Sequence, residues 1–403
     1  MKTLAISLHR LGDLIMHAHV LKAFQMKTGH SLSLLTHPFY KQIDFLFPFI
    51  SNIYLFERDL CQKSIGENIY NKSWPFIHIQ EIIENINSEK FDQIVDLSQS
   101  ETSARWMSFL NSPQKIGVAY GSDLQQKTHC SDNSWIRYLH ANAQSKIHFV
   151  DLFKKSLNLP LDPLPQALEK KIRPNRILFQ TLTSDVKKNW TTVKWIELFH
   201  KMLKFYPQFE FQILSSPSEY VRLNSEFSNL SKTIPIVVTT IEETFELLKN
   251  SRMLVTLDTA IKHLATWTGT PIVELALGSS NPYETGAYQE GAIILKSNVP
   301  CTPCRHSSSC SQSTFLCQDE LSVDSVFAAM QLQLQSHNET LHANISENII
   351  LSFLEGKNNH QRLTPIHYVH SSPEGWWSCS SILNLKKRED YERRSKQSIE
   401  IDY

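Results

Sequence analysis

Runs of apolar residues alternate along the chain with segments whose apolar residues recur every three or four positions. The clearest unit opens with an apolar run from Leu254 to Leu257, which predicts a buried strand. A helix with one buried face follows, and that face carries Ile261, Leu264, Ala265 and Thr268. Gly269 and Pro271 end the helix, and the run from Ile272 to Leu277 predicts the next strand. In such a unit the helix N-terminus lies at the carboxyl end of a parallel strand, which favours a bound phosphate.

The same alternation runs through both halves of the sequence. In the first half it predicts strands at residues 3–8, 31–36, 52–56, 91–97 and 115–119, and helices after residue 13, at 77–90 and at 148–157. In the second half it predicts strands at 176–181, 210–215 and 234–239, and helices at 193–205, 219–230 and 240–248. Alternating strands and helices are typical of an α/β fold with a doubly wound parallel sheet in each half.

Proline and polar residues mark the expected boundaries between these halves. A proline-rich linker is predicted at residues 161–175, between an N-terminal domain (1–160) and a C-terminal domain (176–330). The polar stretch at 121–146 is interpreted as a solvated loop or as a lid that faces an anion. Residues 331–403 form a less regular extension with a helix predicted near 347–354 and no assigned function.

Charge and hydropathy exclude several classes of protein. Lys and Arg together number 40, as do Asp and Glu, so the net charge does not indicate a nucleic-acid partner. No apolar run approaches the roughly 18 residues of a transmembrane helix. The short apolar run at the N-terminus leads directly into His9 and Arg10, unlike a signal peptide, so we expect a cytoplasmic protein.

Chemically active residues follow the predicted strands at three loops: Gly12-Asp13, residues 181–190, and Asp258-Thr259-Ala260. Gly12 is predicted to occupy a turn, where it can adopt a positive φ. From the residues alone, Asp13 and Asp258 are equally compatible with capping a helix and with serving a site. His263 either packs on the sheet or reaches a bound ligand.

Four cysteines form a separate cluster with the spacing Cys301-x2-Cys304-x5-Cys310-x6-Cys317. Short spacings of this kind are typical of tetrahedral zinc sites, and thiolates also suit iron. We therefore predict a structural zinc or iron ion there. Reduced free thiols are the alternative.

Together these motifs resemble glycosyltransferase family 9, the ADP-heptose:lipopolysaccharide heptosyltransferase family. The resemblance rests on Arg10-Leu11-Gly12-Asp13-Leu14, on the segment from Thr183 to Trp190, on the segment from Leu257 to Ala265, and on Cys301-Thr302-Pro303-Cys304. It covers roughly residues 1–330. It implies a GT-B architecture, in which two Rossmann-like domains face each other across a cleft, without a catalytic cofactor or metal.

The resemblance also implies the reaction and its residues. Heptose would pass from ADP-heptose, with inversion, to an inner-core lipopolysaccharide acceptor at the inner membrane surface, and Asp13 would be the general base. Lys188 would bind the diphosphate, unless the register is shifted to Lys187. Glu219 would bind the ribose, unless it only begins a helix. Asp258, Thr259, Ala260 and His263 would complete the donor site, with Ala260 standing where the family usually has glycine.

Two other functions remain open from the sequence. One is a protein heptosyltransferase that modifies a serine of an autotransporter adhesin. The other is a catalytically silent member of the family, which binds nucleotide or metal as an assembly factor; the alanine at position 260 and the extension at 331–403 keep this alternative open.

Overall fold

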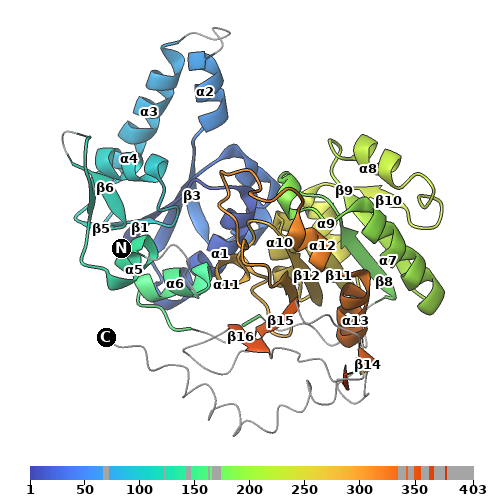
Figure 1. The fold of residues 1–403 in the computed structure, drawn as a ribbon. Helices are drawn as coiled ribbons and strands as arrows, with labels where there is room; N and C mark the ends of the chain where they lie inside the picture. Colours follow the sequence, from blue (N-terminus) through green and yellow to red (C-terminus); the bar gives the residue numbers. More distant parts are fainter. Residues whose placement is uncertain are drawn as a thin grey trace, which may run out of the picture.

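The computed structural model describes residues 1–66, 72–121, 124–141, 147–161, 164–165 and 174–334, together with short strands at 342–343, 349–354, 363–366 and 377–378. It contains two α/β halves, each built on its own sheet and lying side by side (Figure 1). This arrangement confirms the predicted α/β class. Among the described helices, none is both long and apolar enough to cross a bilayer.

The N-terminal half is built on a parallel sheet with the strand order β3-β2-β1-β4-β5. Its strands are β1 (Lys2–Ser7), β2 (Ser31–Thr36), β3 (Ile50–Leu55), β4 (Gln93–Asp96) and β5 (Gln114–Ile116). Its helices are α1 (Leu11–Thr28), α2 (Arg58–Gly66), α3 (Trp74–Ser88), α4 (Glu101–Phe109), α5 (Ser134–Ala141) and α6 (Phe149–Ser156), with short 3-10 turns η1 (Pro38–Gln42) and η2 (Asp44–Leu46). A hairpin of β6 (Val118–Tyr120) and β7 (Lys127–His129) completes it.

The C-terminal half has the strand order β10-β9-β8-β11-β12-β13-β15-β16, in which β8 to β13 are parallel and the last two strands antiparallel. Its strands are β8 (Arg176–Gln180), β9 (Glu210–Ser215), β10 (Ile236–Val238), β11 (Met253–Leu257), β12 (Ile272–Ala276), β13 (Ile293–Ser297), β15 (Ile349–Leu354) and β16 (Leu363–Ile366). Its helices are η4 (Val186–Lys188), α7 (Thr192–Phe205), α8 (Tyr220–Glu226), α9 (Ile241–Lys249), α10 (Ala260–Thr268), α11 (Pro282–Thr285), α12 (Leu316–Glu320) and α13 (Val323–Leu334). Strands β14 (His342–Ala343) and β17 (Trp377–Ser378) pair separately.

The central strands β11 and β12 are buried along their whole length because helices cover both faces of each sheet. In β11, Leu254 packs in one core cluster, whereas Val255 and Leu257 pack in another on the opposite face. The first of these clusters also contains Leu14 and Ile15 of α1. A single apolar core therefore continues from one half into the other, with α1 packed against α10.

Three sequence-based expectations are corrected by the structure. Residues 349–354 form strand β15 rather than a helix, since this largely apolar run pairs antiparallel with β13. The polar stretch at 121–146 contains β7 and α5, although residues 122–123 and 142–146 lie outside the described residues. Gly12 lies within α1 rather than in a turn, and it does not have a positive φ. Most of the predicted linker, at 162–163 and 166–173, is also outside the described residues.

Candidate active site

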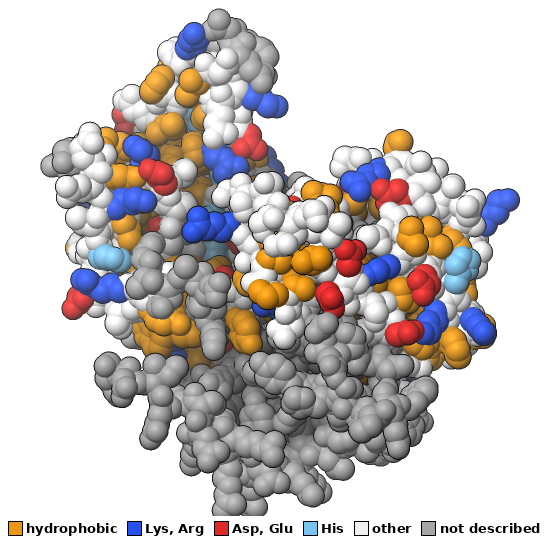
Figure 2. Space-filling view, in the orientation of Figure 1, with side chains coloured by type: hydrophobic (Ala, Val, Ile, Leu, Met, Phe, Trp, Pro, Cys, Tyr) orange, Lys and Arg blue, Asp and Glu red, His pale blue; other side chains and the backbone are white. Residues whose placement is uncertain are grey.

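A cavity of about 800 Å³ lies between the two halves, at the carboxyl ends of β1, β8, β9 and β11. Its size is typical of a site for a small-molecule ligand, and its place at the ends of parallel strands is typical of nucleotide sites. Figure 2 shows basic side chains in the crease between the halves. Seven residues singled out from the sequence line this one cavity: Asp13, Lys188, Glu219, Asp258, Thr259, Ala260 and His263.

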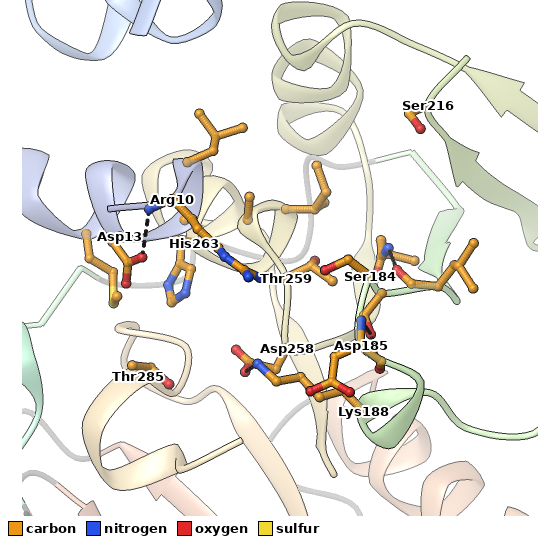
Figure 3. Close-up of a pocket in the computed structure, with 18 of the residues that line it drawn as sticks. Arg10, Asp13, Ser184, Asp185, Lys188, Ser216, Asp258, Thr259, His263 and Thr285 are labelled. Carbon is orange, nitrogen blue, oxygen red and sulfur yellow. Dashed lines mark hydrogen bonds and ion pairs between the residues drawn. The ribbon is translucent and has the colours of Figure 1, made fainter. Parts of the chain in front are cut away.

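Asp13 enters the cavity from the N-terminal half (Figure 3). It lies in the first turn of α1, and its Oδ2 accepts a hydrogen bond from the backbone N–H of Arg10 at 3.1 Å. Arg10, not Asp13, is the N-cap residue of this helix. Burial raises the pKa of Asp13, and the nearby Asp258 raises it further, while His9 and the N–H of Arg10 act in the opposite direction. A carboxylate with a raised pKa is a stronger base, which suits it to accept a proton.

Asp258 is held between two lysines in the turn that joins β11 to α10. Its Oδ2 lies 2.7 Å from Lys188 Nζ and accepts a hydrogen bond from Ser280 Oγ at 3.0 Å, and its Oδ1 lies 2.5 Å from Lys262 Nζ. Burial alone would raise the pKa of Asp258, but Lys262 and Lys188 outweigh it and hold the pKa well below its usual range. Asp258 is therefore an ionised partner of lysines. It does not cap the helix, because Thr259 is the N-cap residue.

Two polar atoms at the N-terminus of α10 are buried without a partner among the described groups, Thr259 Oγ1 and His263 Nδ1. Burial, and next the charge of Lys262, lower the pKa of His263 well below its usual value, so the imidazole is neutral. Buried polar atoms without partners are costly and uncommon. Beside a helix N-terminus and the ammonium of Lys188, they indicate a place for an anionic ligand.

Ala260 occupies the first position of α10, where the resembling family usually has glycine. Its φ is not positive, so the methyl group causes no backbone strain. The substitution therefore leaves the helix N-terminus in a form that can still present backbone N–H groups to the cavity.

The two adjacent lysines of η4 point in different directions. Lys188 lines the cavity, as its ion pair with Asp258 requires. Lys187 is 6% exposed, and its Nζ donates to the backbone carbonyls of Arg305 and His306 at 3.1 Å each and of Ser308 at 2.5 Å. Lys187 thus fixes the loop that follows Cys304, and only Lys188 is available to the cavity.

Glu219 lies on the far wall of the cavity, at the N-terminus of α8. Its Oε2 accepts hydrogen bonds from Ser216, from the backbone N–H at 3.1 Å and from Oγ at 2.7 Å. Ser216 therefore fixes the carboxylate of Glu219 at the carboxyl end of β9. Its predicted contact with a ribose stays a prediction.

Sequence reasoning missed two basic residues of the cavity, Arg10 and His306. The side chain of Arg10 extends from the start of α1 toward Thr259 (Figure 3), and no described carboxylate lies within ion-pair distance of its guanidinium. Burial lowers the pKa of His306, as do Lys188 and Arg10 nearby. Arg10 lies two residues before Gly12 and caps the helix that carries Asp13, so its position in the sequence was a usable signal. His306 comes from the cysteine-rich loop and gave no comparable signal.

The four thiols of the cysteine cluster lie near one another: burial raises the pKa of Cys317 most, and the other three thiols raise it further. All four cysteines lie in the described residues, yet no group of three or more His, Cys, Asp or Glu side chains in that part of the chain is gathered to hold a metal ion. Cys317 is buried on α12, while Cys304 Sγ lies 3.4 Å from the carbonyl of Cys301 and Cys310 Sγ lies 3.9 Å from that of Thr314. The zinc or iron site predicted at Cys301, Cys304, Cys310 and Cys317 therefore stays a prediction.

Comparison with solved structures shows the same fold in three bacterial proteins. Escherichia coli heptosyltransferase WaaC with ADP is 15% identical, with a TM-score of 0.60 over 83% of this chain and 100% of that chain. Escherichia coli ADP-heptose lps heptosyltransferase II is 16% identical, with a TM-score of 0.58 over 83% and 98%. A glycosyl transferase family 9 protein from Veillonella parvula is 14% identical, with a TM-score of 0.61 over 83% and 97%. These likenesses confirm the GT-B architecture.

Comparison of the sequence alone gives the family. No curated protein matches the chain. The family model described as glycosyltransferase family 9 (heptosyltransferase) matches residues 79–314, more than half of the 403 residues. The chain therefore belongs to glycosyltransferase family 9, the heptosyltransferase family.

Proposed function

We propose that this protein transfers a heptose from ADP-heptose to a hydroxyl group of an inner-core lipopolysaccharide acceptor, with inversion at the anomeric carbon. One observation carries the proposal. The cavity brings the carboxylate of Asp13 from one half opposite Lys188 and the unpartnered Thr259 and His263 from the other. A base facing an anion site across a cleft is the arrangement that displacement of a nucleoside diphosphate needs.

The donor is assigned to the C-terminal half. Lys188 would bind the diphosphate together with the backbone N–H groups at the start of α10, where the helix dipole also favours negative charge. Glu219 would hold the ribose through the carboxylate oxygen that Ser216 does not occupy. The solved Escherichia coli relatives carry ADP and ADP-2-deoxy-2-fluoro heptose, which supports the same class of donor here.

The acceptor is assigned to the N-terminal half, next to Asp13. In the proposed step the acceptor oxygen attacks the anomeric carbon of the heptose while Asp13 takes its proton. The bond from that carbon to the β-phosphate oxygen breaks, and the electron pair remains on ADP. Lys188 and the N–H groups of Ala260 and Ile261 would stabilise this new charge. Attack from the side opposite ADP inverts the anomeric configuration.

The identity of the acceptor, lipopolysaccharide, is the most specific part of the proposal. It is supported by the name of the relative of similar fold, an ADP-heptose lps heptosyltransferase, and by membership of the family. A protein serine is the alternative acceptor. In the third alternative, a silent nucleotide-binding protein, the cavity would bind ADP without transfer.

Release of ADP separates these three functions. Purified protein is incubated with ADP-heptose, with and without lipopolysaccharide that lacks core heptose, and the ADP is measured. We expect release that depends on this acceptor, together with a heptose added to it in the mass spectrum. Transfer to a serine-containing adhesin fragment instead would replace the lipid acceptor by a protein. Tight ADP binding without release from ADP-heptose would leave only the silent function.

A further inference from the structure

Four alternating charges run in a line from the interior of the C-terminal half to the cavity. Glu274 Oε1 on β12 lies 2.7 Å from Lys262 Nζ on α10, and Lys262 Nζ lies 2.5 Å from Asp258 Oδ1. Asp258 Oδ2 lies 2.7 Å from Lys188 Nζ, and Figure 3 shows these last two side chains meeting at the cavity wall. The line therefore ends in an anion at its buried end and in a cation at the cavity.

The buried half of this line is completely shielded from solvent. Lys262 and Glu274 are both 0% exposed. The second carboxylate oxygen of Glu274 accepts the backbone N–H of Ala287 at 2.9 Å, so both of its oxygens are held. Burial lowers the pKa of Lys262, but Asp258 and Glu274 outweigh that effect and raise it, so the ammonium stays charged. Each of these charges depends on the others to be tolerated in the interior.

Stability alone does not account for this ion pair. A buried ion pair is often no more stabilising than well-packed apolar side chains of the same volume. Other buried residues of α10, such as Leu264 and Ala265, are apolar and 0% exposed. A lysine four residues after an aspartate is ordinarily a solvent-exposed helix pair. Here the side chain of Lys262 points inward and forms an ion pair with Asp258, the carboxylate that holds Lys188.

We propose that Lys262 is a positioning residue for the donor site and acts through Asp258 on Lys188. Together with Glu274 it holds Oδ1 of Asp258, so that Oδ2 faces the cavity and keeps the Lys188 ammonium at the N-terminus of α10. A lysine side chain loses much rotational freedom when it is ordered, so ordering it before the ligand arrives strengthens binding. Lys262 also offsets the charge of Asp258, which leaves the charge of Lys188 available to an incoming anion. The proposal rests on the proposed function, in which Lys188 binds the diphosphate.

A thermodynamic cycle with ADP tests the coupling between Lys262 and Lys188. Lys262→Met together with Glu274→Gln removes one buried charge of each sign, so the paired variant should melt close to the wild type, whereas either change alone should lower the melting temperature. Lys188→Ala is then introduced into the wild type and into the paired variant, and ADP affinity is measured by calorimetry. We expect Lys188→Ala to weaken ADP binding about 30-fold in the wild type and no more than about 3-fold in the paired variant.

Ser280→Ala is the matched control. Ser280 donates to the same Asp258 carboxylate without carrying a charge, and we expect Lys188→Ala to keep its full effect in that variant. If Ser280→Ala also removed the effect of Lys188, the specific role of Lys262 would be refuted. An equal loss from Lys188→Ala in the wild type and in the paired variant would also overturn it, while leaving the proposed function intact. If Lys188→Ala leaves the ADP affinity of the wild type unchanged, the assignment of Lys188 to the diphosphate fails first.

A second variant covers the case in which the paired substitution does not fold. Lys262→Met alone is measured at several pH values from 7 down to 5, because burial raises the pKa of Glu274 and the substitution removes the lysine charge that opposes this. The effect of Lys188→Ala on ADP affinity is then measured in this variant and in the wild type at each pH. Loss of the Lys188 contribution supports the positioning role, and an undiminished contribution overturns it.

Discussion

Gly12 of α1 lies against His263 of α10 so closely that a Cβ atom on Gly12 would stand 3.2 Å from His263 Cδ2. The same atom would lie 3.5 Å from Ala260 Cα. Glycine therefore permits a close approach between the two halves here, and it is not needed for an unusual backbone conformation. Asp13 is the next residue in the chain, so this contact sets the distance between the proposed base and the proposed phosphate site.

Gly12→Ala should impair transfer more than folding. Alanine favours the helix by about 1 kcal/mol, and the crowding requires a movement of only a few tenths of an ångström, so the free energy of unfolding should change by about 1 kcal/mol or less. The displaced helix would misplace Asp13, and turnover should fall about tenfold or more. Gly66→Ala in α2 is the control, because a Cβ there meets nothing within 4 Å. Equal turnover in both variants would contradict the role of this contact.

Asp13→Asn should remove the general base while leaving the cavity intact. We expect transfer to fall by a factor of about 10²–10⁴, and ADP affinity to stay within about twofold. Because burial raises the pKa of Asp13, the acid limb of the wild-type rate profile should lie above the usual range of an aspartate. Near-wild-type turnover in Asp13→Asn, or a wild-type acid limb in the usual range of an aspartate, would show that Asp13 is not the general base.

The adjacent lysines 187 and 188 should respond differently to substitution by alanine. Lys188→Ala should weaken ADP binding by about tenfold or more, because it removes the ammonium at the cavity. Lys187→Ala should instead lower the melting temperature and expose the loop around His306 to protease, because three carbonyl groups lose their donor. Calorimetry with ADP and limited proteolysis separate the two effects. A larger loss of ADP affinity from Lys187→Ala would place the diphosphate at the other lysine.

The elements that the sequence predicted are those defined by local patterns. The strand–helix–strand unit at β11, α10 and β12 combines two apolar runs with helical spacing and a glycine stop, and each signal lies within a few residues. The candidate residues after these strands could also be predicted to meet, because parallel strands bring their carboxyl ends to one edge of the sheet. Asp13 and Asp258 line one cavity for that reason.

The features that were missed depend on contacts between distant segments. Strand β15 exists because β13 offers a free edge, which local helix propensity at residues 349–354 does not reveal. Gly12 gives no sign in the sequence that His263 will lie against it. Lys262 looks like one half of a surface helix pair until Glu274, twelve residues later, is placed beside it. The cysteine spacing was compatible with a metal, but spacing does not determine where four sulfur atoms lie.

Acidification should destabilise the protein through His17, which is 3% exposed and faces Ser7, Phe153 and His9. Burial, with a smaller contribution from His9, lowers its pKa to about 3. Because the pKa is lower in the folded chain, the unfolded chain takes up the proton first, and stability is lost as pH falls below about 6.5. One such histidine costs about 2 kcal/mol between pH 7 and pH 5.

Denaturant unfolding of His17→Gln at both pH values measures this contribution. Glutamine can still reach the hydroxyl of Ser7, so the variant should fold, and its loss of stability between pH 7 and pH 5 should be smaller than that of the wild type by about 2 kcal/mol. His200→Gln on the exposed surface of α7 is the control and should keep the full pH dependence. The same pH dependence in both variants would mean that His17 is not the titrating group.

The cysteine cluster yields a prediction in which spacing and geometry disagree. The spacing predicts about one zinc or iron ion per chain, since four thiolates at short intervals satisfy a tetrahedral ion with metal–sulfur distances of about 2.3 Å. The described positions provide no such group, so from the geometry we expect metal content far below one ion per chain in protein purified without an affinity tag.

Without a bound metal ion, Cys301, Cys304 and Cys310 should react with a thiol reagent in the native protein, and Cys317, which is 4% exposed, should react only after unfolding. Cys304→Ser with Cys310→Ser should then leave the melting temperature nearly unchanged. Stoichiometric metal that this double substitution abolishes, with a lower melting temperature and protection of all four thiols, would restore the metal site and require residues 301–317 to close around it.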